Sequence, residues 1–168
     1  PYIPMRPPSL EGAGFRGGRG TVYTLGHSTR SLQEFIRILK AYGIETVVDV
    51  RRFPGSRRHP HFAREILSVE LPRNGVKYVW MGDGLGGYRP GGYQRYMRTR
   101  EFRDAFRMLV KLAGRSRTAV VCSEALWFRC HRRFLADRLA REGFKVIHIY
   151  DEGRSQPHRL RRRRTTPR

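Results

Sequence analysis

The sequence predicts an α/β fold, a three-layer α/β/α sandwich with a mainly parallel sheet of about five strands. Short apolar runs alternate with amphipathic helical patterns along the chain, and this order produces right-handed crossovers and a parallel sheet. The runs are continuously apolar, as in strands that are buried on both faces. The 168 residues suit one domain, which we expect over 21–153, between a flexible leader at 1–20 and an Arg-rich basic tail at 154–168.

The first strand is expected at Thr21–Leu25, and the second, rich in β-branched residues, at Glu45–Val50. Between them a helix is expected to begin at Ser31, because Glu34 three residues later completes a capping box. Gly43 is the residue type that commonly follows a helix. The apolar residues of this helix fall on one face, at Leu32, Phe35, Ile36 and Leu39.

The middle of the chain predicts two helices around a third strand. Apolar spacing indicates a helix over about 61–71, and Val76–Trp80 is the next strand. A glycine-rich loop follows over 82–92. Thr99 then caps a helix that Gly114 ends, with an apolar face formed by Phe102, Ala105, Phe106, Leu109 and Ala113.

The last part predicts a fourth strand at Thr118–Cys122, a helix over about 129–142 that ends at Gly143, and a fifth strand at Lys145–Tyr150. In a parallel sheet all strands end at the same edge, and ligands bind outside that edge. Polar and reactive side chains follow each predicted strand. They are His27 and Ser28, then Asp49, Arg51 and Arg52, then the segment 81–87, then Cys122, Ser123 and Glu124, and finally His148, Tyr150 and Asp151.

The most specific pattern is Cys122-Ser-Glu-x5-Cys130-His131-Arg132. A cysteine between a strand end and a helix start meets backbone N–H groups and a positive helix end, which favour the reactive thiolate. The spacing from Cys122 to Arg129 resembles the loop of cysteine-dependent phosphatases and rhodaneses, with one residue more than in phosphatases. Three alternatives stay open: buried packing, a disulfide, and a metal site, although C-x7-C-H lacks the C-x2-C spacing of zinc modules.

Other candidates also have structural readings. His27 titrates near neutrality and suits general acid–base catalysis, or it bonds a loop carbonyl. Asp49 suggests a carboxylate held by the arginines that follow it, or it belongs to a solvated turn. The basic residues of 57–61 suit a phosphate clamp or a solvated loop. The glycine-rich loop lacks the Lys-Ser or Lys-Thr of a phosphate-binding loop, and we interpret it as a mobile segment with Tyr88 and Tyr93 as aromatic contacts.

Charge points to polyanionic partners. The formal net charge is +21, and 31 of the 35 basic residues are Arg, whose planar fork of donors suits phosphate and carboxylate. A GC-rich genome or life at high temperature would also favour Arg. The sequence has no signal-peptide pattern and no apolar run of membrane-spanning length, so a cytoplasmic protein without a membrane partner is expected.

Several of these motifs together resemble a widespread prokaryotic family, domain of unknown function 488. The motifs are Tyr23–Ser28, Asp49–Pro54, Ser56–Phe62, Cys122–Glu124 and Cys130–Arg132. The resemblance spans about 21–150, and the family usually has Ala at the place of Ser123. It implies a compact cytoplasmic α/β domain with a shared site, and it implies no particular activity.

The leading hypothesis is therefore a cysteine-dependent enzyme for an anionic substrate that contains phosphate or a nucleotide. Cys122 is the expected nucleophile, His27 or Glu124 moves protons, and Asp49 orients a neighbour. The expected substrate-binding residues are Ser28, Arg51, Arg52, Cys130, His131 and Arg132. No metal and no cofactor are expected. The alternatives are a non-catalytic nucleic-acid-binding protein and a scaffold with bridged or buried cysteines.

Overall fold

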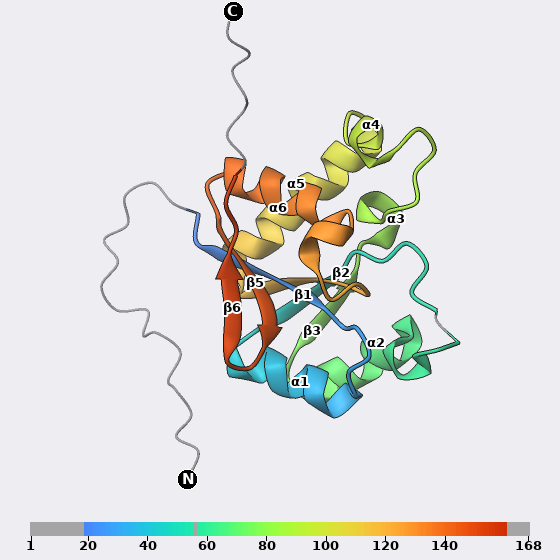
Figure 1. The fold of residues 1–168 in the computed structure, drawn as a ribbon, viewed down its shortest axis with the longest axis vertical. Coiled ribbons are helices and arrows are strands. Elements are labelled where there is room, and N and C mark those ends of the chain that lie inside the picture. The colour runs from blue at the N-terminus through green and yellow to red at the C-terminus, as the bar shows by residue number, and fades with distance from the viewer. Residues whose placement is uncertain (1–18, 56, 161–168) are drawn as a thin grey trace, which may run out of the picture.

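The structure is a computed structural model that describes residues 19–55 and 57–160 (Figure 1). One sheet of six strands has the order β3-β2-β4-β1-β5-β6. The strands are β1 (Thr21–Gly26), β2 (Thr46–Asp49), β3 (Lys77–Trp80), β4 (Thr118–Cys122), β5 (Lys145–Asp151) and β6 (Arg154–Pro157). The first five strands are parallel and β6 is antiparallel to β5, so the predicted α/β fold with a mainly parallel sheet is confirmed.

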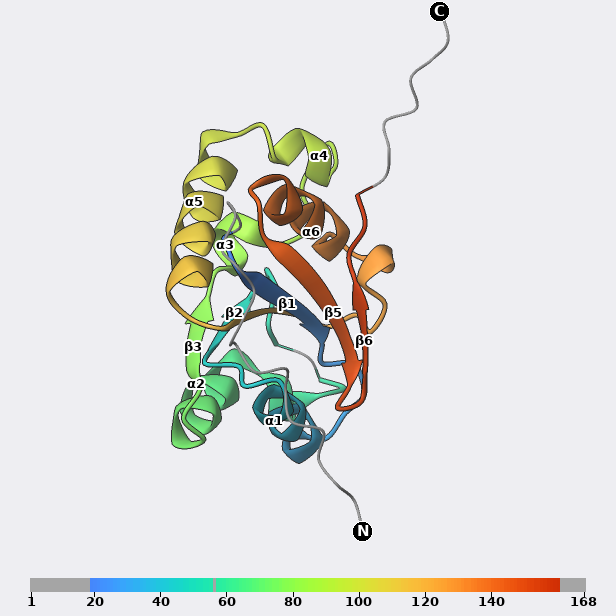
Figure 2. The ribbon, with the colours of Figure 1, turned by 90° about the vertical axis from the view of Figure 1, so that its left-hand side faces the viewer.

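Helices cover both faces of this sheet, as Figure 2 shows. The helices are α1 (Leu32–Ala41), α2 (Arg64–Arg73), α3 (Gly82–Leu85), α4 (Tyr93–Tyr96), α5 (Arg100–Arg115) and α6 (Arg132–Arg141), with 3-10 turns at Pro60–Phe62 and Trp127–Arg129. One buried cluster joins α1 and α2 to the sheet, and a second cluster joins α5 and α6 to its other face. Within the described part of the chain, every helix is too short or too polar to cross a lipid bilayer.

Local sequence signals account for the best-predicted helices. Ser31 accepts a hydrogen bond from the backbone N–H of Glu34 at 3.1 Å, and Thr99 accepts one from Phe102 at 3.2 Å. These contacts satisfy N–H groups that have no partner inside the helix. Each of the two helices then buries its apolar face, as the periodicity predicted.

Three segments differ from the sequence prediction. The second helix begins at Arg64, after a 3-10 turn that Pro60 opens. The glycine-rich segment contains the short helix α3. The last helix begins at Arg132 and not near residue 129, because residues 127–129 form a separate turn. Cys130 therefore lies immediately before the N-terminus of α6.

The strand β6 was not predicted, because its residues Arg-Ser-Gln-Pro contain no apolar run. All four residues are exposed, and the strand joins the sheet by backbone pairing with β5. The predicted basic tail thus begins as an edge strand. Its residues 161–168, and residues 1–18 of the predicted leader, lie outside the described part of the chain.

Candidate functional site

A cavity of about 830 Å³ lies at the edge where β1, β2 and β4 end. Segments that follow these three strands form part of its wall, and the segment after α3 and the turn before α6 complete it. Seven predicted site residues line it: His27, Arg51, Arg52, Cys122, Glu124, Cys130 and His131. Three others, Ser28, Asp49 and Arg132, are not among the lining residues. The chain order of strands and helices therefore brings the separated motifs together.

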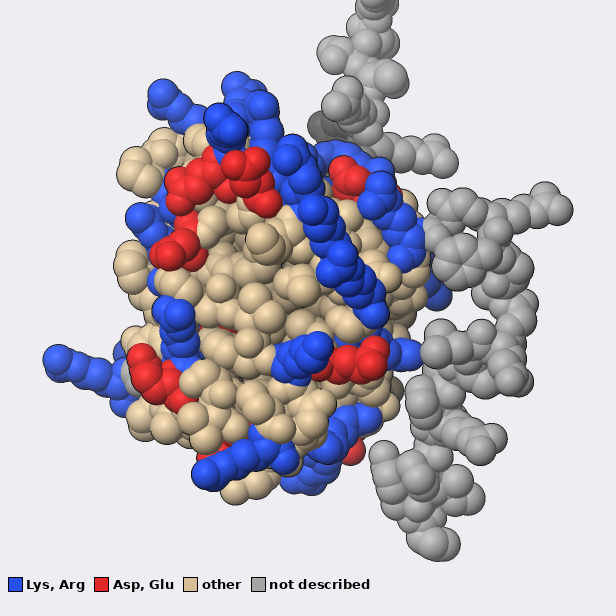
Figure 3. All heavy atoms as spheres, turned by 180° about the vertical axis from the view of Figure 1, so that it is seen from behind, with Lys and Arg blue, Asp and Glu red and all other residues tan. Residues whose placement is uncertain are grey.

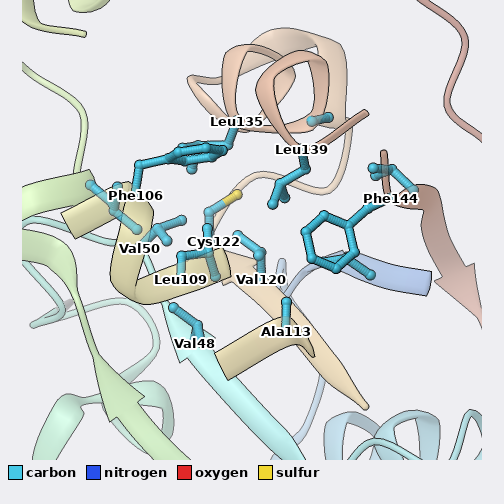
Figure 4. Packing of buried hydrophobic residues seen from close by; sticks show 14 of the residues in the cluster. Val48, Val50, Phe106, Leu109, Ala113, Val120, Cys122, Leu135, Leu139 and Phe144 are labelled. Carbon is cyan, nitrogen blue, oxygen red and sulfur yellow. The ribbon is translucent and has the colours of Figure 1, made fainter. Parts of the chain in front are cut away.

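The two cysteine sulfurs are neighbours, with 3.4 Å between the Sγ atoms of Cys122 and Cys130. Both cysteines are free thiols. Cys122 is only 2% exposed and belongs to the apolar cluster between the sheet and α6, with its sulfur directed towards that helix (Figure 4). Cys130 is half-buried, so it is the more accessible thiol of the pair.

The two thiols differ in acidity. The hydrogen bond from Cys122 and the charge of Arg132 lower the pKa of Cys130 to about 6, although burial acts in the opposite direction. The same hydrogen bond, together with burial, raises the pKa of Cys122 well above its usual value. At pH 7 Cys130 is therefore the thiolate and Cys122 donates its S–H to it. The positive N-terminus of α6 favours the same distribution of charge.

Arg132 is buried beneath this pair, with 1% of its surface exposed. Its Nη2 donates to the carbonyl oxygens of Glu124 and Ala125 at 2.7 and 3.3 Å, and its backbone N–H donates to Cys130 Sγ at 3.4 Å. Among the described residues no carboxylate forms an ion pair with Arg132. A buried cation needs a compensating negative charge, and the thiolate of Cys130 is the one that the site offers.

Asp49 and Arg51 form a second buried charge pair. Arg51 donates from Nε and Nη2 to the two carboxylate oxygens of Asp49, at 2.9 and 2.7 Å. Tyr78 donates to the same carboxylate at 2.5 Å, and Arg51 Nη2 also bonds the carbonyl of Phe62 at 2.8 Å. Asp49 is 0% exposed. The pair therefore connects the end of β2 to β3 and to the 3-10 turn before α2.

His27 is held in its neutral form. Its Nδ1 lies 2.9 Å from the carbonyl oxygen of Ser28, which only accepts, so Nδ1 carries the proton. Nε2 then accepts from Arg51 Nη1 at 3.3 Å. Burial, with the nearby Arg51, lowers the pKa of His27 to about 4. With both nitrogens engaged, this geometry favours the structural role that was open beside acid–base catalysis.

His131 offers a free ring nitrogen to the cavity. Its Nε2 donates to the carbonyl oxygen of Val50 at 3.0 Å, which leaves Nδ1 as the acceptor. No partner for Nδ1 occurs among the described residues, and this atom faces Gly87 of the cavity wall. Burial lowers the pKa of His131 to about 4, so the ring is neutral at pH 7 and able to accept a proton or a hydrogen bond.

Close backbone contact fixes the loop after Cys122. A Cβ atom on Gly26 would lie 1.8 Å from the carbonyl oxygen of Glu124, so the position tolerates only glycine. Beside it, Ser28 has a left-handed φ of 51°, a conformation that costs energy for a residue other than glycine. The ends of β1 and β4 are thus pressed together at the thiol pair.

The mouth of the cavity combines aromatic and cationic side chains. Phe53, Tyr88 and Phe128 are 67%, 86% and 45% exposed, and all three line the cavity. Arg129 and Arg133 line the same cavity, and both residues are exposed. Phe128 and Arg133 were not predicted as site residues, because nothing in their local sequence distinguishes them from ordinary residues at the start of a helix.

Among the described residues, no three His, Cys, Asp or Glu side chains are placed to hold a metal ion together. The chain matches the family model described as "Domain of unknown function DUF488" over residues 31–139, more than half of its length. The match includes the segments after β2 and β4 and leaves out His27. No curated protein and no solved structure matches the chain. The chain belongs to the DUF488 family.

Proposed function

We propose that this protein is a cysteine-dependent enzyme for an anionic substrate that contains phosphate or a nucleotide, with Cys130 as the nucleophile. The observation that carries the proposal is the thiolate of Cys130 between the thiol of Cys122 and the buried Arg132, at the wall of a large cavity. A lowered thiol pKa beside a specific charge partner is typical of a reactive cysteine. Cys130 takes the role that the sequence suggested for Cys122.

Arginines at the mouth supply the recognition of the anion. Arg51 is engaged by Asp49, Phe62 and His27, so its donors hold the protein together. The guanidinium groups of Arg129 and Arg133 donate no hydrogen bond to other described residues, and that of Arg133 lies over the ring of Phe134. Free guanidinium forks at a cavity mouth suit bidentate contacts with phosphate or carboxylate. Arg52, bound to the carbonyl of Tyr88 at 2.6 Å, orders the neighbouring loop.

In the proposed reaction the Sγ atom of Cys130 bonds to the electrophilic atom of the substrate while the bond to the leaving group breaks. The leaving group needs a proton, and Glu124, which lines the cavity, passes one from solvent to the leaving group. The neutral His131 then accepts the proton of a water molecule at Nδ1, and the resulting hydroxide releases the product from Cys130.

Thiol alkylation across pH tests the nucleophile. We expect iodoacetamide to label Cys130 with a midpoint near its pKa of about 6, with no labelling at this midpoint in Cys130→Ser. Cys122→Ala, the matched variant, keeps the reactive thiol but raises the midpoint, because it removes the S–H donor that lowers the pKa of Cys130. A wild-type midpoint near the ordinary thiol value of about 8.5 would contradict the proposal.

The second candidate is binding of single-stranded nucleic acid, which the exposed aromatic rings beside arginines at the cavity mouth favour. The face opposite to that of Figure 1 shows a diagonal row of Lys and Arg in its upper part, with acidic and uncharged surface around it (Figure 3). Binding of a short oligonucleotide that weakens steeply with salt and is reduced by Tyr88→Ala, but is unchanged in Cys130→Ser, would favour this function over catalysis.

A further inference from the structure

We infer that Cys122 and Cys130 form a reversible two-electron redox couple, in which Cys130 attacks a hydroperoxide and Cys122 closes an intramolecular disulfide. The inference rests on the reactive Cys130 of the proposed function and adds a second chemistry at the same thiol. It accounts for a feature that nucleophilic catalysis leaves unused, a second free cysteine in direct contact with the first.

The distance between the sulfurs carries the inference. The Sγ atoms are 3.4 Å apart, and a disulfide bond measures about 2.05 Å, so the two sulfurs need to approach by little more than an ångström. Cys130 lies in the short segment between the 3-10 turn at 127–129 and α6, so it belongs to no helix or strand. Cys122, at the end of β4, is the fixed partner.

The two cysteines have unequal access, as a peroxide reaction requires. Both cysteines line the cavity, but Cys130 is half-buried and Cys122 is buried. The accessible thiolate meets the oxidant first, and the protonated thiol waits beside it. Arg132 is within reach of the thiolate through its backbone N–H, and its positive charge favours the oxyanion that forms when the peroxide bond breaks.

The thiolate of Cys130 attacks one peroxide oxygen, so that a sulfur–oxygen bond forms and the O–O bond breaks. The departing alkoxide or hydroxide takes a proton from water. Cys130 is now a sulfenic acid, oxidised by two electrons. The sulfur of Cys122 displaces its hydroxyl group, which leaves as water with the Cys122 thiol proton, and the disulfide forms. Two molecules of a small thiol reduce it by exchange and become a disulfide themselves.

The disulfide also switches the proposed enzyme off. It removes the thiolate that acts as nucleophile and takes from Arg132 the negative charge that compensates it. Peroxide would then inhibit the chemistry of Cys130 and a small thiol would restore it. Both cysteines already line the cavity, so the switch acts directly at the proposed site.

Intact-protein mass spectrometry of the full chain tests the inference. Reduced protein treated with hydrogen peroxide is expected to lose the mass of two hydrogens and to recover it with dithiothreitol. Because the sequence contains only two cysteines, any intramolecular bridge joins Cys122 to Cys130. Cys122→Ser, treated in the same way with dimedone, is expected to give a single adduct on Cys130. Cys130→Ser is expected to oxidise more slowly by a factor of about ten or more, and to form no intramolecular bridge.

The outcomes separate the two proposals. If Cys130 alkylates with a low midpoint, but peroxide converts it to sulfinic acid without a bridge, the redox couple is refuted and the nucleophile proposal stands. If Cys130 neither alkylates at low pH nor forms a bridge, both proposals fall. A dithiothreitol-reversible bridge together with the dimedone adduct in Cys122→Ser supports the couple, and a bridge that forms at equal rate with Cys122 as the first site of oxidation overturns the assigned roles.

Discussion

At the scale of single residues, the site depends on one buried cation. Arg132 holds the loop after Cys122 through two carbonyl oxygens, and it reaches Cys130 through its backbone N–H. Its side-chain Nε has no hydrogen-bond partner among the described residues. We therefore assign Arg132 to stabilising the thiolate and positioning the loop, and not to the substrate contact that its place in the sequence suggested.

Replacement of this residue gives a prediction that a merely structural role would not produce. Arg132→Met keeps the length of the side chain and removes its charge, so the pKa of Cys130 is expected to rise from about 6 towards the ordinary thiol value of about 8.5. The measurement is the alkylation rate of Cys130 across pH. Arg141→Met, at the exposed far end of α6, is the matched control and is expected to leave the midpoint in place. An unchanged midpoint in Arg132→Met would remove its assigned role.

At the scale of secondary-structure elements, a chain of hydrogen bonds ties β6 to the site. Asp137 of α6 only accepts, so His158 after β6 donates from Nε2 at 2.7 Å. His158 Nδ1 then accepts from His148 Nε2 at 2.8 Å, and His148 Nδ1 accepts from Thr24 at 2.6 Å. The ring of Trp127, in the turn before Cys130, stacks on His148 with 4.3 Å between ring centroids.

His158, in the predicted tail, connects His148 to Asp137 in this chain of hydrogen bonds. In His158→Ala the inner His148 loses its partner, and a loss of about 1–3 kcal/mol in the free energy of unfolding is expected because a buried polar atom becomes unsatisfied. Urea unfolding measures it. Arg159→Ala alters the next residue, which is exposed, and is expected to stay within about 0.5 kcal/mol of the parent protein. Equal stabilities of the two variants would show that this chain of hydrogen bonds contributes nothing to the free energy of unfolding.

At the scale of the whole molecule, buried histidines link stability to pH. Burial lowers the pKa of His27 and His131 to about 4 and of His148 to about 3, against about 6.5 in an unfolded chain. Between pH 4 and 6.5 the unfolded chain binds more protons than the folded one. The contribution of these histidines to the free energy of unfolding must therefore rise with pH in this window, and this contribution is complete above pH 6.5.

Acidification is expected to destabilise the protein by up to about 1.4 kcal/mol per pH unit for each of these histidines. Urea unfolding at several pH values between 4 and 7 measures the slope. In His131→Gln the side-chain amide nitrogen takes the place of the ring Nε2 in the hydrogen bond to Val50 without a titrating group, so the slope should decrease. A slope equal to that of the parent protein would show that His131 does not contribute to the pH dependence.

Local patterns of the sequence account for most of the fold. The capping residues Ser31 and Thr99 and the helical spacing behind them act over a few residues, and the structure has both helices where they were predicted. The strand β6 could not be predicted from its composition, because the free edge of β5 recruits it by backbone pairing alone. The start of α6 shifted because residues 127–129 close a separate turn, which no local signal marked.

The sequence by itself determined that the motifs of the candidate site meet at one edge of the sheet. Strands and helices that alternate along the chain direct every strand end to one edge, so His27, Arg51 and Cys122 had to meet there. The tertiary structure alone decided their chemistry. Burial, the 3.4 Å contact between the thiols and the buried Arg132 select Cys130 as the thiolate. Acidity depends on desolvation and on neighbouring charges in space, and the order of residues along the chain contains neither.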